Sequence, residues 1–68
     1  MKVVIIGSGN VATVLGRLFK KNGHTIIQVV SRNLLHAELL ANELDCPFTD
    51  NDGILDQSGE IYLVAVSD

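Results

Sequence analysis

Hydrophobic residues along this chain occur both in short continuous runs and in runs with helical spacing. The continuous runs at residues 3–6 and 25–30 are rich in Val and Ile, which is typical of strands buried on both faces of a parallel sheet. Two further runs, at residues 46–49 and 61–66, predict a short third strand and a buried last strand. Because Pro47 cannot donate a backbone hydrogen bond, the short strand belongs at an edge.

The first run with helical spacing covers residues 10–22. Its expected packing face consists of Val11, Leu15, Leu18 and Phe19. The side chains expected to face water are Arg17, Lys20 and Lys21. Lysines in the last turn, followed by Gly23, are a typical end of a helix.

A second amphipathic helix is predicted over residues 34–44, with Asn33 as its N-terminal cap. Its expected packing face consists of Leu34, Ala37, Leu40, Ala41 and Leu44. The end of this helix carries a weaker signal, because Asp45 and Cys46 stand where glycine is expected. Residues 50–57 predict a further short helix, capped by Asp50 or Asn51.

This order of strands and helices predicts the α/β class and a Rossmann-type parallel sheet. We expect residues 1–68 to form the N-terminal part of one NAD(P)-binding domain, with about four strands in the order third, second, first, last (3-2-1-4). Helices are expected on both faces, and ligands at the carboxyl ends of the strands. Because nothing follows the last strand to cover it, we interpret the chain as a truncated domain whose open edge favours a homo-oligomer.

The composition of the chain limits its expected cellular location and binding partners. A net charge of -3 with five Lys and Arg provides no broad basic field, so we expect no nucleic-acid or anionic membrane partner. No apolar run approaches the roughly 20 residues that span a bilayer. The single cysteine, Cys46, excludes an internal disulfide and, by itself, a four-ligand zinc site. A cytoplasmic location follows as the expectation, and we expect no metal.

The segment between the first strand and the first helix carries the candidate chemistry. Residues 7–12, Gly-Ser-Gly-Asn-Val-Ala, form a G-x-G-x-x-A pattern in the strand-turn-helix context that binds the pyrophosphate of a dinucleotide. The first glycine permits the tight turn, the second lets backbone approach the phosphates, and the alanine lets helix and strand pack closely. The expected phosphate-binding residues are Gly7, Ser8, Gly9, Asn10 and Val11. The alternative is that these glycines only form a sharp turn.

The end of the second strand predicts which dinucleotide binds. Proteins that bind NAD usually place an acidic residue there, which accepts hydrogen bonds from the ribose hydroxyls. This chain has Ser31-Arg32-Asn33 instead, a hydroxyl, a guanidinium and a helix start that favour a 2′-phosphate. NADP(H) is therefore the expected cofactor, ahead of NAD. The alternative is that Arg32 is an ordinary solvated residue.

Three segments together resemble the N-terminal part of the pyrroline-5-carboxylate-reductase-like Rossmann proteins, and in particular their uncharacterised bacterial oxidoreductase-like branch. These segments are residues 3–12, the Val-Val-Ser-Arg at residues 29–32 and the Val-Ala-Val-Ser-Asp at residues 64–68. The resemblance implies an NADP-dependent oxidoreductase in which a further, helical C-terminal domain supplies most of the substrate site. It also implies that Val66 and Ser67 lie near the nicotinamide ribose, and that these 68 residues alone are inactive.

A regulatory nucleotide-sensing domain without catalysis is the competing function. Such sensors, and the methyltransferases that use S-adenosylmethionine, usually carry an acidic residue where this chain has Ser31. Ser31 therefore disfavours both of these functions. No residue is proposed as catalytic. His24 and His36 are each expected to be solvated surface residues.

Overall fold

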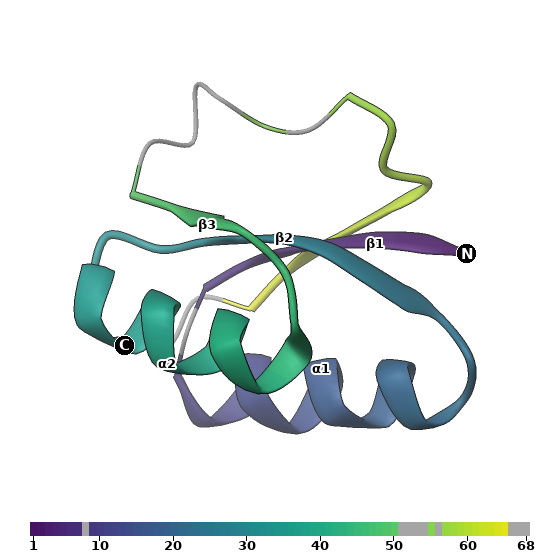
Figure 1. Ribbon diagram of the computed structural model, residues 1–68, viewed down its shortest axis with the longest axis horizontal. Helices are drawn as coiled ribbons and strands as arrows, with labels where there is room; N and C mark the ends of the chain where they lie inside the picture. Colours follow the sequence, from purple (N-terminus) through teal and green to yellow (C-terminus); the bar gives the residue numbers. More distant parts are fainter. Residues whose placement is uncertain (8, 51–54, 56, 66–68) are drawn as a thin grey trace.

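The β-branched runs form a parallel sheet, and the segments with helical spacing form two helices packed on it (Figure 1). The structure is a computed structural model that describes residues 1–7, 9–50, 55 and 57–65. Its elements in chain order are β1 (Lys2–Ile6), α1 (Asn10–Lys21), β2 (Thr25–Val30), α2 (Leu34–Leu44), β3 (Phe48–Thr49) and β4 (Ile61–Val64). Residues 51–54 and 56, which cover most of the helix predicted over residues 50–57, lie outside the described residues.

The four strands are ordered β3-β2-β1-β4, and all three neighbouring pairs are parallel. Both the order and the direction predicted from sequence are therefore confirmed. β1 lies between β2 and β4, with Ile5 opposite Val29 on one side and Leu63 on the other. This central position explains why Val3 and Ile5 expose none of their surface.

The packing face of α1 differs from the predicted one. That face was expected to contain Val11, Leu15, Leu18 and Phe19. It is wrong at Val11 and Leu18, which are 56% and 50% exposed. The buried residues of α1 are Ala12 and Gly16, with Leu15 and Phe19 partly buried beside them. The helix therefore packs through its smallest side chains, and size rather than hydrophobicity marks the centre of the contact.

The approach of Gly16 to its neighbours shows how close this contact is. A Cβ atom built on Gly16 would lie 2.8 Å from Cδ1 of Leu44 on α2 and 3.0 Å from Cδ1 of Ile5 on β1. Ordinary carbon contacts are longer than about 3.4 Å. The absence of a side chain at Gly16 thus lets α1 lie against both α2 and the sheet.

The start and the end of α2 follow rules of helix capping. The Asn33 side chain accepts a hydrogen bond from the backbone N–H of His36 at 3.1 Å, which confirms the predicted cap. Asp45 ends the helix in the left-handed conformation, with φ 59° and ψ 54°, so it takes the role expected of a glycine. Leu34 was expected to pack and is 49% exposed, so the buried face of α2 begins at Ala37.

The two helices lie on the same face of the sheet, where they enclose the core (Figure 1). The expectation of helices on both faces is not met by the described residues. On the opposite face, Tyr62 and Val64 of β4 are 40% and 66% exposed. The prediction of a buried last strand is therefore wrong at Tyr62 and Val64, because no described helix covers these side chains. β4 also forms an open edge of the described sheet, and self-association through it stays a prediction.

A short segment before β4 covers part of that second face. A Cβ atom on Gly59 would lie 2.9 Å from Cγ2 of Val4 and 2.9 Å from the ring carbon Cζ of Tyr62. The backbone at Gly59 therefore lies against β1, and Val4 is completely buried although no described helix packs on its side of the sheet. Among the described residues, no helix is long and apolar enough to cross a membrane.

Candidate functional site

The glycine turn and the loop that carries Ser31 and Arg32 lie side by side, at the carboxyl ends of β1 and β2. Ile6 at the end of β1 is paired with Val30 at the end of β2, and the N–H of Gly7 donates to the carbonyl of Val30 at 2.7 Å. Neighbouring strands are about 4.8 Å apart, so the turn after β1 and the loop after β2 begin as neighbours. Both helices also start at this edge (Figure 1). Sheet pairing thus brings together what the sequence separates by more than 20 residues.

Gly7 makes the turn out of β1 in a conformation that favours glycine. Its φ is 131°, and the residue is buried. A side chain at this φ would strain the backbone, so the first glycine of the pattern has a conformational reason for its identity. Ser8, the next residue, lies outside the described residues.

Among the described residues, no side chain caps the backbone N–H groups at the start of α1. Gly9 is the N-cap residue, has extended backbone at φ −78° and ψ −166°, and provides no capping side chain. Its carbonyl accepts hydrogen bonds from both the N–H and the hydroxyl of Thr13, each at 3.0 Å. No acidic residue occurs in the first turn, where Asn10 and Val11 are exposed. Such a helix start favours an anion.

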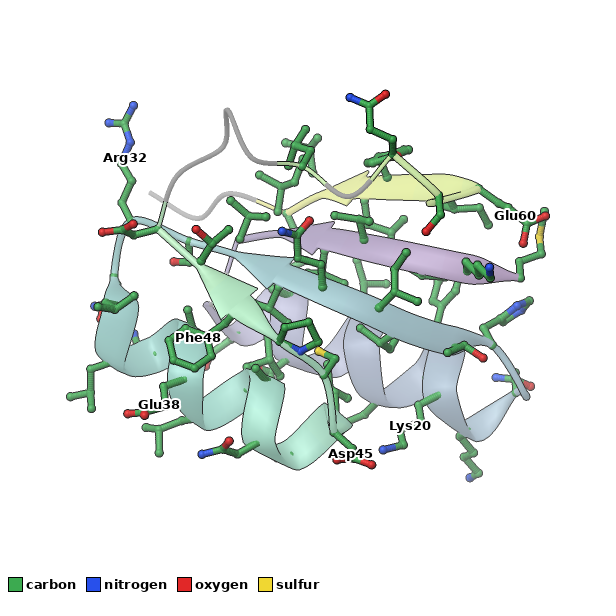
Figure 2. All side chains as sticks on the ribbon, turned by 45° about the horizontal axis from the view of Figure 1, so that its top comes forward. Lys20, Arg32, Glu38, Asp45, Phe48 and Glu60 are labelled. Carbon is green, nitrogen blue, oxygen red and sulfur yellow. The ribbon has the colours of Figure 1, made fainter. Side chains whose placement is uncertain are left out.

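The loop after β2 is held by a backbone hydrogen bond to β3 and by side-chain hydrogen bonds of its own. The N–H of Ser31 donates to the carbonyl of Thr49, and the N–H of Asn33 donates to the hydroxyl oxygen of Ser31 at 3.2 Å. Arg32 is exposed, and its side chain extends from this loop into solvent, away from the helices (Figure 2). The amide oxygen of Asn33 is engaged in the cap of α2.

The first turns of both helices suit an anionic ligand. The first turn of α2, like that of α1, contains no acidic residue. Ser31 and Arg32 stand where a carboxylate would repel a second phosphate. The residues present therefore fit an anionic group such as the phosphate of a dinucleotide. Val66 and Ser67, predicted near the nicotinamide ribose, lie outside the described residues.

A cavity of about 260 Å³ opens between α1 and α2 beside the glycine turn. It is lined by Gly9, Asn10, Thr13, His36, Leu39, Leu40 and Glu43. The sequence placed His36 on the solvated surface, and the residue is exposed, but it also lines this cavity together with the start of α1. The spacing of apolar residues in α2 could not predict that His36 lines the cavity, because it does not show which side of α2 faces α1.

The other end of the cavity carries an ion pair between the helices. Arg17 on α1 donates hydrogen bonds to the carboxylate of Glu43 on α2, one of them from Nη2 to Oε1 at 2.8 Å. The hydrogen bond from Arg17 holds the pKa of Glu43 below its usual value. Glu43 is therefore a carboxylate whose charge is compensated by its neighbour, and the pair is exposed to water.

Comparisons with known proteins agree with this geometry. The family described as NADP oxidoreductase, coenzyme F420-dependent, matches residues 2–67. A crystal structure of a candidate NADP oxidoreductase from Bacteroides fragilis superposes with a TM-score of 0.91 at 31% identity. That match covers 98% of this chain and 26% of the other, so the chain spans about a quarter of that protein's length. A search of curated proteins found no match.

Proposed function

Because the chain belongs to the family of coenzyme F420-dependent NADP oxidoreductases, we propose that it is the N-terminal, cofactor-binding part of an oxidoreductase and that it prefers NADP(H) to NAD(H). One observation carries the preference. The glycine turn adjoins Ser31 and Arg32, and neither helix that starts there has an acidic residue in its first turn. Two helix starts and one guanidinium then act on a bound anion.

Each group has a separate task in this proposal. The turn from Gly7 to Val11 holds the pyrophosphate through backbone N–H groups, since Gly9 has no Cβ that would keep the phosphates away. Ser31 and Arg32 bind the 2′-phosphate, and Asn33 fixes the loop that carries them by capping α2. A bound nicotinamide supplies hydride transfer, for which the protein provides orientation.

The remainder of the enzyme is also part of the proposal. The Bacteroides fragilis protein is about four times as long as the matched segment, which supports a substrate-binding region outside these 68 residues. Val66 and Ser67 are assigned to the nicotinamide ribose, and the pyrroline-5-carboxylate-reductase-like branch is kept as the subgroup, both by the sequence resemblance. We assign none of the residues to coenzyme F420. The cytoplasm and a homo-oligomer are the proposed setting.

Isothermal titration of the chain with NADPH and NADH tests the proposal. Charge-assisted hydrogen bonds are worth about 1.5 to 3 kcal/mol, so the preference for NADPH should be roughly tenfold to a hundredfold. Arg32→Ala should remove most of this preference by weakening NADPH alone. Lys21→Ala is the matched control, because it removes the same charge from the far end of α1 and should leave the preference intact.

A second variant distinguishes binding of the pyrophosphate from binding of the 2′-phosphate. Gly9→Val should weaken NADPH and NADH together, since its Cβ blocks the approach to the pyrophosphate that both share. The φ of −78° at Gly9 is open to valine, so the fold should persist, which circular dichroism can check. Equal affinity of the unaltered protein for NADPH and NADH would show that Ser31 and Arg32 are only a polar strand end.

A further inference from the structure

The carbonyl of Gly9, at the start of α1, is held by two hydrogen bonds from one residue. The backbone N–H and the side-chain hydroxyl of Thr13 both donate to its oxygen, each at 3.0 Å. The bond from the N–H is the first of the helix, and the carbonyl of an N-cap residue normally accepts one. The bond from the hydroxyl is additional, and a carbonyl oxygen has a second lone pair to accept it. Thr13 therefore fixes the direction of this carbonyl.

The direction of this carbonyl also sets the direction of a backbone N–H in the glycine turn. The carbonyl of Gly9 and the N–H of Asn10 belong to one peptide unit, which is planar and trans, so the two groups point in opposite directions. A rotation of that unit would turn both of them together. The N–H of Asn10 is one of the first four of α1, which have no acceptor within the helix. Thr13 thus orients an N–H that the proposed function assigns to the pyrophosphate.

The identity of Gly9 explains why this peptide unit needs a further hydrogen bond. Glycine leaves the backbone more freedom than other residues do, and Gly9 provides no capping side chain of its own. A Ser or Asp at this position could cap the helix, but its side chain would occupy the side from which phosphates approach. Thr13 is half-buried, lies one turn further along α1, and lines the cavity together with Gly9 and Asn10. It can therefore hold the turn from within the helix and leave the glycine open to a ligand.

We propose that Thr13 is a positioning residue, whose hydroxyl holds the peptide unit between Gly9 and Asn10 in the orientation that binds the pyrophosphate. A group that is ordered before the ligand arrives raises affinity, because binding then has less disorder to remove. NADPH and NADH share the pyrophosphate, so Thr13 contributes equally to both and leaves the preference between them to Arg32. This inference rests on the proposed function and adds a residue that acts through the glycine turn.

The test compares two replacements of Thr13 by calorimetry with NADPH and with NADH. Thr13→Val removes the hydroxyl and keeps a β-branched side chain of nearly the same shape. It should weaken both cofactors by about threefold to tenfold, the value of one hydrogen bond, and change their ratio by less than about twofold. Thr13→Ser retains the hydroxyl and should bind both within about twofold of the unaltered protein. Thr25→Val is the matched control, because it makes the same change at an exposed residue at the amino end of β2.

A second measurement distinguishes positioning from a purely structural role. A hydroxyl that only stabilised the helix would change the midpoint of urea unfolding and leave the affinity of the folded chain intact. In nuclear magnetic resonance titrations with inorganic pyrophosphate, the amide signal of Asn10 should shift in the unaltered protein. Thr13→Val should need about threefold to tenfold more pyrophosphate to reach half of that shift.

Each other outcome overturns a stated part of the argument. If both cofactors bind the unaltered protein and bind Thr13→Val equally well, Thr13 does not position the turn and the proposed function stands. If Thr13→Val weakens NADPH alone, or if Thr13→Ser loses as much affinity as Thr13→Val, the inference is wrong. If the unaltered protein binds neither NADPH nor NADH, the proposed function itself fails, and the inference fails with it.

Discussion

Adding a side chain at Gly16 should destabilise this fold, although glycine is a poor helix residue. The first added carbon would lie 2.8 Å from Cδ1 of Leu44 and 3.0 Å from Cδ1 of Ile5, and both of those residues are in the core. Each neighbour must therefore move by roughly half an ångström or more to reach an ordinary contact distance. Leu44 is 3% exposed, so it has little free space to move into.

The magnitude follows from two opposed contributions to the free energy of unfolding. Replacing glycine by alanine in a helix interior gains about 1 kcal/mol, whereas overpacking costs about 1 to 3 kcal/mol. Gly16→Ala should therefore destabilise by about 0 to 2 kcal/mol. Gly16→Val gains less from helix propensity and adds two more carbons, so we expect a loss of about 2 to 3 kcal/mol. The total free energy of unfolding of a 68-residue chain is roughly 3 to 10 kcal/mol.

Urea unfolding followed by far-ultraviolet circular dichroism measures both variants, since the chain has no tryptophan. Leu44→Ala provides the matched test, because it removes the side chain that meets the new atoms. Leu44→Ala alone should lower the free energy of unfolding by about 2 to 5 kcal/mol. In the double variant with Gly16→Val, the loss should be at least about 1 kcal/mol smaller than the sum of the two single losses. Additive losses, or a Gly16→Val variant as stable as the unaltered protein, would refute the close approach of α1.

Two smaller predictions concern α2 and the residues that follow it. Asn33→Ala should lower the free energy of unfolding by about 1 kcal/mol because it removes the cap on the His36 N–H, whereas Asn33→Asp should retain most of the stability in the same urea assay. Burial raises the pKa of the Cys46 thiol to about 11, so alkylation of the folded chain at about pH 8 should be at least tenfold slower than in urea. Equal rates folded and unfolded would show that this thiol is not shielded.

The sequence predicted strand order well because that order depends on a few strong signals. The β-branched runs at residues 3–6 and 25–30, separated by one helix, leave few topologies for a parallel sheet. The helix faces were predicted less well. Hydrophobicity placed Val11 and Leu18 inside, whereas close approach of α1 to the sheet requires small residues at the contact, such as Ala12. A pattern of apolar positions contains no information about how near two elements come.

In the candidate site, too, local sequence pattern predicted some features and missed those that depend on packing. Local pattern sufficed for Gly7 and for the cap at Asn33, because backbone conformation and helix starts depend on neighbouring residues. It did not suffice for His36, whose place beside Gly9 depends on how α2 is rotated against α1. Residues that act across two helices become visible only once the packing of those helices is known.

The residues that hold the fold and those proposed to hold the cofactor are separate, and this makes the binding experiments interpretable. The sheet depends on side chains such as Val3 and Val29, which expose none of their surface. Arg32 is exposed and its side chain extends into solvent (Figure 2), so Arg32→Ala removes no buried packing and should change the free energy of unfolding by less than about 0.5 kcal/mol. A loss of NADPH affinity in Arg32→Ala would therefore report on the contact with the phosphate. Gly7 differs, because its φ of 131° couples any substitution to strain in the turn itself.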